Sequence, residues 1–139
     1  MAERGRDTGV CEALTQTVIG SALRIHRELG PGLLESVYEA LLAHDLMRQG
    51  FRVLRQQPVS LRYDGLTIDE SFRVDLLIEQ QLVIELKSTA RSDPVFARQL
   101  LTYLRLMNLP IGLLINFGGV TLKDGLQRVI NSQAIRDIS

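Results

Sequence analysis

Two segments near the N-terminus have apolar residues at helical spacing. In the first, residues 10–29, apolar side chains recur every three or four positions, at Leu14, Val18, Ala22, Ile25 and Leu29. The second begins near Leu33 or Leu34, shows the same spacing, and stops at Gly50. Gly30-Pro31-Gly32 separates them, because Pro cannot continue a helix and Gly tolerates left-handed dihedral angles. The pattern therefore predicts two consecutive helices.

After Gly50 the spacing of apolar residues changes to two, which is typical of strands. A first strand is predicted up to Tyr63, in which Val59, Leu61 and Tyr63 alternate with polar residues. Asp64-Gly65 is a strong hairpin-turn signal. Residues 68–78 and 82–87 then form two segments that are apolar on both faces, separated by the polar residues 79–81. Strands of this kind lie in the middle of a sheet that is covered on both sides.

The C-terminal third predicts a helix, a strand and a helix. Pro94 suits the first turn of a helix, which ends before Pro110. Residues 111–115 read as a buried strand, and a last helix is predicted over about 122–130, with Leu126, Val129 and Ile130 facing inward. The predicted order is α-α-β-β-β-α-β-α. It describes an α/β fold with helices on both faces of the sheet, formed by a single domain over residues 10–139 after a fraying N-terminus, residues 1–9.

Composition narrows the class of protein. The 139 residues suffice for one domain, and 16 basic and 16 acidic residues give no net charge, which disfavours coating of nucleic acid by charge alone but permits a local basic groove. A single Cys excludes an internal disulfide and a Cys-based zinc site. No apolar run approaches the ~20 residues of a membrane span. We therefore expect a soluble cytoplasmic protein with no membrane partner.

Three charged residues, Asp75, Glu85 and Lys87, interrupt the most apolar pair of predicted strands. If residues 79–81 form a three-residue loop, Ile78 faces Leu82, and counting back places Asp75 opposite Glu85. Facing side chains of an antiparallel pair have Cβ atoms ~5 Å apart. Glu85 and Lys87 are two positions apart and share a face of the strand. The spacing thus predicts two carboxylates and one amine at one place.

Two carboxylates this close repel each other unless a positive charge lies between them. Hard oxygen ligands suit Mg²⁺ or Mn²⁺, and a metal held by Asp75 and Glu85 would polarise a bound water. Lys87 could orient or deprotonate that water, or hold a phosphate. It is one of only two lysines among the 16 basic residues. The alternative is a structural ion pair, either Asp75 with Lys87 or Arg73 with Glu85.

Residues 32–38, Gly-Leu-Leu-Glu-Ser-Val-Tyr, match the G-x-x-E-x-x-Y signature of the GxxExxY proteins. Further segments match that family in the same order: 29–32, 73–77, 83–87, 99–103 and 112–117. The chain therefore resembles this family from about residue 11 to 131. The resemblance implies the PD-(D/E)XK nuclease superfamily and a restriction-endonuclease-like core, with a mixed four-stranded sheet flanked by helices.

The resemblance also implies roles for individual residues. Asp75 and Glu85 would hold a divalent metal, Lys87 would assist the attacking water, and Glu35 on the preceding helix would complete the metal ligands. The pair Gln99 and Tyr103 is similar to a Gln-x-x-x-Tyr motif of RecB-like nuclease domains, which shapes the site and contacts DNA. The chain departs from the family's pattern at one point, with Phe96 where relatives often carry a His.

The expected function is metal-dependent hydrolysis of phosphodiester bonds in nucleic acid, most readily DNA, with Mg²⁺ or Mn²⁺ as cofactor. The alternative is a catalytically silent module of the same fold that binds DNA or a partner protein. A homodimer is plausible for so small a domain acting on a duplex.

Three other reactive residues are expected to have structural roles. His26 is expected to pack against a helix or to form hydrogen bonds, His44 to face solvent, and Cys11 to behave as a small hydrophobic residue. Arg48, Arg52 and Arg55 form a basic cluster that could meet a phosphate backbone or simply face solvent.

Overall fold

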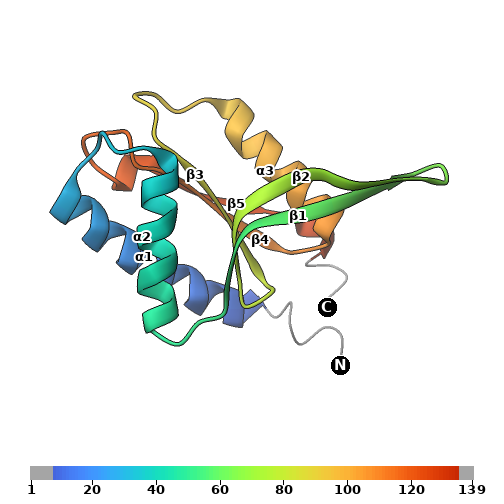
Figure 1. Ribbon diagram of the computed structural model, residues 1–139, viewed down its shortest axis with the longest axis horizontal. Coiled ribbons are helices and arrows are strands. Elements are labelled where there is room, and N and C mark those ends of the chain that lie inside the picture. The colour runs from blue at the N-terminus through green and yellow to red at the C-terminus, as the bar shows by residue number, and fades with distance from the viewer. Residues whose placement is uncertain (1–7, 135–139) are drawn as a thin grey trace.

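The computed structural model describes residues 8–134 (Figure 1). In chain order the elements are α1 (Thr8–Leu29), α2 (Glu35–Arg48), β1 (Val53–Tyr63), β2 (Leu66–Ile78), β3 (Leu82–Lys87), α3 (Pro94–Met107), β4 (Ile111–Asn116), the 3-10 turn η2 (Lys123–Gly125) and β5 (Leu126–Ile130). The predicted fraying terminus lies outside the described residues, apart from residues 8 and 9, which begin α1. None of the described helices combines the length and the apolar character needed to cross a membrane.

The strands form one mixed sheet in the order β1-β2-β3-β4-β5. All neighbouring strands are antiparallel except β3 and β4, which are parallel and are connected through α3. Between β2 and β3, Ile78 pairs with Leu82 and Leu76 pairs with Ile84. This register confirms the three-residue loop over 79–81 on which the predicted meeting of Asp75 and Glu85 depends.

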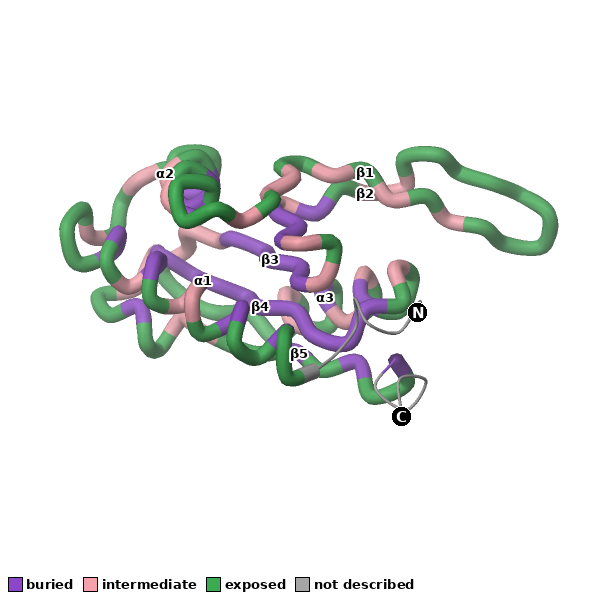
Figure 2. The backbone as a smooth tube through the Cα atoms, turned by 90° about the horizontal axis from the view of Figure 1, so that it is seen from below, coloured by how far each residue is buried: buried purple, intermediate pink, exposed green. Residues whose placement is uncertain are grey.

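Helices cover both faces of the sheet, with α1 and α2 on one face and α3 on the other (Figure 1). Alternate residues of β3 enter the two hydrophobic clusters: Ile84 packs beneath α1 and α2, whereas Val83 packs with Leu100 and Leu104 of α3. Both faces of β3 and β4 are buried as a result (Figure 2). The prediction of a central, doubly covered hairpin strand is thus confirmed for β3 and the end of β2.

The structure corrects the predicted C-terminal helix. Residues 122–130 form the short turn η2 and then strand β5, which pairs antiparallel with β4 and brings the sheet to five strands instead of four. Val129 is buried, but Ile130 is 46 % exposed and does not face inward as predicted. Leu126 and Val129 are three residues apart and would share one face of a helix, but in the strand they pack on opposite faces of the sheet, Leu126 with the α1 and α2 cluster and Val129 with the α3 cluster. The unpaired backbone groups along the edge of β4 favour the strand.

The hairpin of β1 and β2 extends away from the body of the molecule, and its tip is exposed (Figures 1 and 2). Asp64 and Gly65 both have positive φ, 47° and 82°, as the predicted tight hairpin turn requires. Strand β1 begins at Val53, earlier than the alternation from Val59 suggests. Its first half is mostly polar and is held in the sheet by pairing with β2.

The loop after β4 runs against the segment that follows β3, next to Lys87. Phe117 N donates to Lys87 O at 2.8 Å, and buried Asn116 bonds to the backbone of Thr89 through both side-chain atoms, Oδ1 and Nδ2. A methyl group added at Gly118 would lie 2.2 Å from Thr89 O. This close approach fixes the chain beside the end of β3.

Gly118→Ala is therefore expected to lower the free energy of unfolding by about 1–3 kcal/mol, because backbone must shift to admit the methyl group. Chemical denaturation would measure the loss. Gly119→Ala is the matched control, since its methyl would meet Thr121 O at an ordinary 3.5 Å. Equal stability of the two variants would contradict the close packing described for Gly118.

Candidate active site

The candidate site lies where β2 and β3 separate. Main-chain pairing between the two strands ends at Leu76 and Ile84. At the next position, side-chain carboxylates accept hydrogen bonds from the backbone of the opposite strand. Glu85 Oε1 accepts a hydrogen bond from Asp75 N at 3.0 Å, and Asp75 Oδ2 accepts one from Leu86 N at 2.8 Å. The two carboxylates therefore meet at the split of the sheet, as their spacing predicts.

Burial and mutual repulsion dominate the electrostatics of this pair. Glu85 is only 7 % exposed, and this burial, followed by the charge of Asp75, raises the pKa of Glu85 to about 8. Burial also raises the pKa of Asp75, although hydrogen bonds from Leu86 and Gln56 act against the rise. A positive ion between the two groups would relieve a repulsion that the protein alone leaves in place.

Lys87 lies on the same strand, two residues from Glu85. Its charge acts against the rise in pKa of both carboxyl groups. Its Nζ lies 4.6 Å from the centre of the Phe96 ring, at the start of α3. Among residues 8–134, neither of the alternative ion pairs forms. Lys87 has no ion pair with Asp75, and Arg73 pairs with Glu70 at 2.5 Å instead of with Glu85. The ring of Phe96, where relatives of the resembled family often have a His, thus holds the ammonium group by a cation–π contact.

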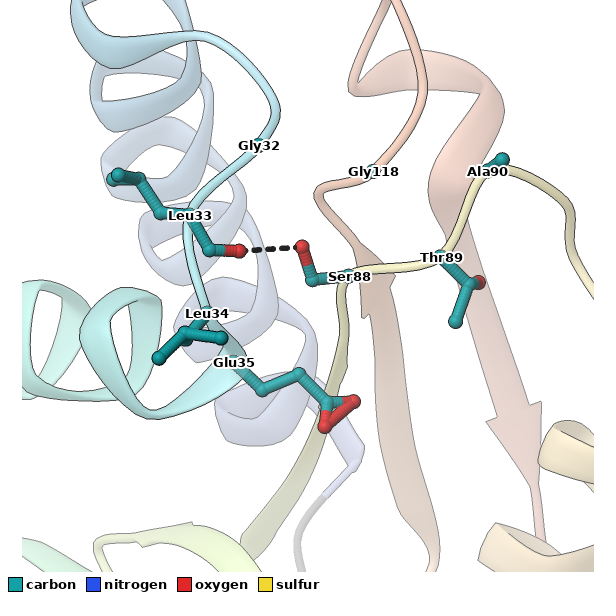
Figure 3. Close-up of a pocket in the computed structure, with 8 residues that line it drawn as sticks. All are labelled: Gly32, Leu33, Leu34, Glu35, Ser88, Thr89, Ala90 and Gly118. Atoms are coloured by element: carbon teal, nitrogen blue, oxygen red, sulfur yellow. Dashed lines mark hydrogen bonds between the residues drawn. The ribbon is translucent and has the colours of Figure 1, made fainter.

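Glu35 is the first residue of α2 and is exposed. It lines a pocket of about 450 Å³ together with residues 32–34, 88–90 and 118. Figure 3 shows its side chain reaching from α2 toward β3, and Ser88 Oγ donates to Leu33 O at 2.7 Å. The charge of Glu35 contributes to the raised pKa of Glu85. The fold therefore brings Glu35 near the carboxylate pair, with the Ser88 bond tying the two elements together.

Tyr103 and Gln99 lie on α3, one helical turn apart. The Tyr103 ring stacks on Phe72 with centroids 4.1 Å apart, and burial and the charges of Glu85 and Asp75 raise its pKa. Tyr103 is thus within the field of the carboxylates. Gln99 is exposed, and no side-chain hydrogen bond connects it to Asp75 or Glu85 within the described part of the chain.

Two polar residues of the site were not predicted from the sequence. Glu39 is 6 % exposed and accepts hydrogen bonds from Arg55 Nε at 3.0 Å and from Gln56 Nε2 at 2.6 Å. Gln56 Nε2 also donates to Asp75 Oδ1 at 3.2 Å. Glu39 could have been found, because it lies four residues after Glu35 on the same helix face. Nothing in the local sequence marks Gln56.

The donor chemistry fits a divalent cation of the Mg²⁺ type. Asp75 and Glu85 offer carboxylate oxygens at one place, and Glu35 lies close enough for its charge to act on Glu85. No group of three or more His, Cys, Asp or Glu side chains within residues 8–134 is already arranged around a common point for a metal. Of the proposed metal ligands, Asp75 and Glu85 are therefore the two whose carboxylates already lie together.

The residues expected to be structural lie where predicted. His26 is buried, and its Nε2 lies 3.2 Å from Phe117 O and 3.1 Å from Gly119 O, so that α1 is tied to the loop after β4. His44 is exposed, and Cys11 is buried in the cluster beneath α1. Arg55 of the basic cluster forms an ion pair with Glu39.

This combination of a mixed sheet, a split between its central strands and an Asp, Glu and Lys at that split defines a nuclease-like α/β protein. A family model described as the PD-(D/E)XK nuclease superfamily matches residues 12–129. The chain belongs to this superfamily.

Similarity to individual proteins is weak. The chain is similar to the solved structure described as "Crystal structure of SSO0001", with 16 % sequence identity and a TM-score of 0.36. The match covers 84 % of this chain and 66 % of that chain, so the chain spans less than two thirds of its length. A likeness of this size carries no argument about function. No curated protein matches the chain.

Proposed function

We propose that this protein is a divalent-metal-dependent nuclease that hydrolyses phosphodiester bonds, with DNA as its substrate. The observation that carries the proposal is the buried carboxylate pair of Asp75 and Glu85, with Lys87 two residues further along β3. The chain's membership of the PD-(D/E)XK nuclease superfamily supports it. Both pKa values are raised because burial disfavours the ionised carboxylates, so a purely structural role does not account for placing two of them here.

Mg²⁺ or Mn²⁺ held by Asp75 and Glu85, with Glu35 as a further ligand, would supply the positive charge that stabilises a reacting phosphate and would acidify a bound water. Both carboxyl groups must be ionised to act as ligands. Because Glu85 has a pKa of about 8 without a cation, its proton has to leave when the site is loaded.

Lys87 would orient the attacking water through Nζ or, as the neutral amine, accept the proton that this water loses. A lysine suits this task because its amine can change its protonation state, which a guanidinium cannot do. The Phe96 ring limits the positions that the ammonium group can take. Tyr103, near the carboxylates, and Gln99, exposed one turn earlier, would contact the nucleic acid from α3.

Mn²⁺ is expected to raise the melting temperature of the wild-type protein and to leave that of Asp75→Asn unchanged. At 100 times the dissociation constant, a ligand that binds only the folded state stabilises it by about 2.7 kcal/mol. Differential scanning calorimetry with and without Mn²⁺ measures this. Asp64→Asn is the matched control, because Asn suits the left-handed position in the hairpin turn. An equal rise in melting temperature with Mn²⁺ in both variants would show that Asp75 does not hold the metal.

Fluorescent DNA and RNA strands, incubated with Mg²⁺ or Mn²⁺, test the substrate. Cleavage of DNA by the wild-type protein and none by Asp75→Asn is the expected result. Cleavage confined to RNA would overturn the choice of DNA. Binding of DNA with no cleavage under any of these conditions would favour the catalytically silent module.

A further inference from the structure

Gln56 occupies an unusual position on β1, directly across from Asp75. Its neighbours Arg55 and Gln57 pair with Leu76 and Val74, but Gln56 itself has a left-handed backbone, with φ of 49°. A left-handed conformation costs about 1–2 kcal/mol for a residue other than Gly. The side chain of Gln56, on this strained backbone, points to Asp75 in the candidate site.

The side-chain nitrogen of Gln56 connects two carboxylates. Nε2 donates to Glu39 Oε1 at 2.6 Å and to Asp75 Oδ1 at 3.2 Å. A primary amide suits this role because its nitrogen has two hydrogens and no positive charge that would compete with a cation for the carboxylates. Glu39 in turn is buried and anchored by Arg55 Nε at 3.0 Å. The chain from Arg55 through Glu39 and Gln56 thus ends on Asp75.

Both oxygens of Asp75 are held by this arrangement. Leu86 N fixes Oδ2 at 2.8 Å, and Gln56 fixes Oδ1. Two hydrogen bonds on different oxygens define the plane of the carboxylate, whereas one bond alone would leave it free to rotate. Without Gln56, the hydrogen bond from Leu86 N would be left to orient the Asp75 carboxylate relative to Glu85.

We propose that Gln56 is a positioning residue that orients Asp75 for binding of a divalent cation, with Glu39 as its anchor. This inference rests on the proposed function, since it concerns the same metal site. Hydrogen-bond partners of metal ligands typically change metal affinity 10- to 100-fold when removed.

Gln56→Gly is the test variant, because Gly removes the amide and accepts the positive φ without strain. Isothermal titration calorimetry with Mn²⁺ is expected to show affinity at least 10-fold weaker than in the wild-type protein, while urea denaturation without metal shows undiminished stability. Gln57→Ala is the matched control, since the Gln57 amide donates to Pro58 O at 3.4 Å and to no other group within residues 8–134. Its Mn²⁺ affinity is expected to equal that of the wild-type protein.

Wild-type Mn²⁺ affinity in Gln56→Gly would overturn the role of Gln56 and leave the proposed function standing. Lost stability with unchanged affinity would likewise overturn it, because it would show that Gln56 only joins α2 to β1. Absence of Mn²⁺ binding in the wild-type protein would overturn the proposed metal site and this role with it. If Gln56→Gly does not fold, Gln56→Asn, with an amide too short to span both carboxylates, is read by the same criteria.

Discussion

Lys87→Ala is expected to abolish DNA cleavage while the protein remains folded. Removal of a group that transfers a proton in the reaction typically lowers the rate 10²- to 10⁴-fold. The fold should survive because the backbone of Lys87 provides the structural contacts. Lys87 pairs with Asn116 in the sheet, and its carbonyl oxygen accepts from Phe117 N. Truncation of the side chain leaves these bonds in place.

Two further variants separate the chemistry of the amine from its charge. Lys87→Arg retains a positive charge near Asp75 and Glu85 but cannot lose a proton. We expect it to bind DNA and Mn²⁺ as the wild-type protein does and to cleave DNA no faster than Lys87→Ala. Lys123→Ala replaces the other lysine of the chain, which is exposed on η2, and should cleave normally.

Cleavage rates under single-turnover conditions, together with circular dichroism of each variant, measure these effects. Undiminished cleavage by Lys87→Ala would remove the mechanism proposed here. Full activity of Lys87→Arg would show instead that Lys87 acts by charge alone, as a phosphate ligand.

Glu85→Gln is expected to stabilise the metal-free protein above neutral pH, although it removes a proposed catalytic ligand. Glutamine keeps an oxygen that can accept from Asp75 N, and it carries no charge to repel Asp75. Each pKa unit corresponds to about 1.4 kcal/mol, so a pKa raised from 4.5 to about 8 represents a penalty of a few kcal/mol when Glu85 is ionised.

The sign of the pH dependence follows from proton binding. Below pH 4.5 Glu85 is protonated in both the folded and the unfolded protein, and its pKa shift has no effect. Between pH 4.5 and about 8 the unfolded chain has lost this proton and the folded protein retains it, so the free energy of unfolding falls as pH rises. Above pH 8 the penalty is complete. The difference between Glu85→Gln and wild type should therefore grow from pH 5 to pH 8 and then level off.

Urea denaturation of wild type and Glu85→Gln at several pH values measures this difference. Glu28→Gln, at an exposed position of α1, is the control and should show no such growth. Saturating Mn²⁺ should reverse the order, because the cation binds the ionised form of Glu85 and stabilises only the wild type. A pH-independent difference between wild type and Glu85→Gln would contradict the buried, repelling pair.

The sequence alone was sufficient for the centre of the molecule. Residues 82–87 are apolar on both faces except at Glu85 and Lys87, and this pattern determined both a covered central strand and the charged residues within it. The length of the polar break over 79–81 determined the register with β2, and hence the meeting of Asp75 and Glu85. These features depend on neighbours in the chain or on a single tight turn, which local pattern describes well.

Only the tertiary structure decided the edges of the sheet and the surroundings of the carboxylates. Residues 126–130 became a strand because the edge of β4 needs hydrogen-bond partners, a requirement that no local spacing reveals. Gln56 on β1 reaches Asp75 and connects it to Glu39 on α2, and Phe96 on α3 contacts Lys87. Such contacts join segments far apart in sequence, so they exist only once the helices have packed on the two faces of the sheet.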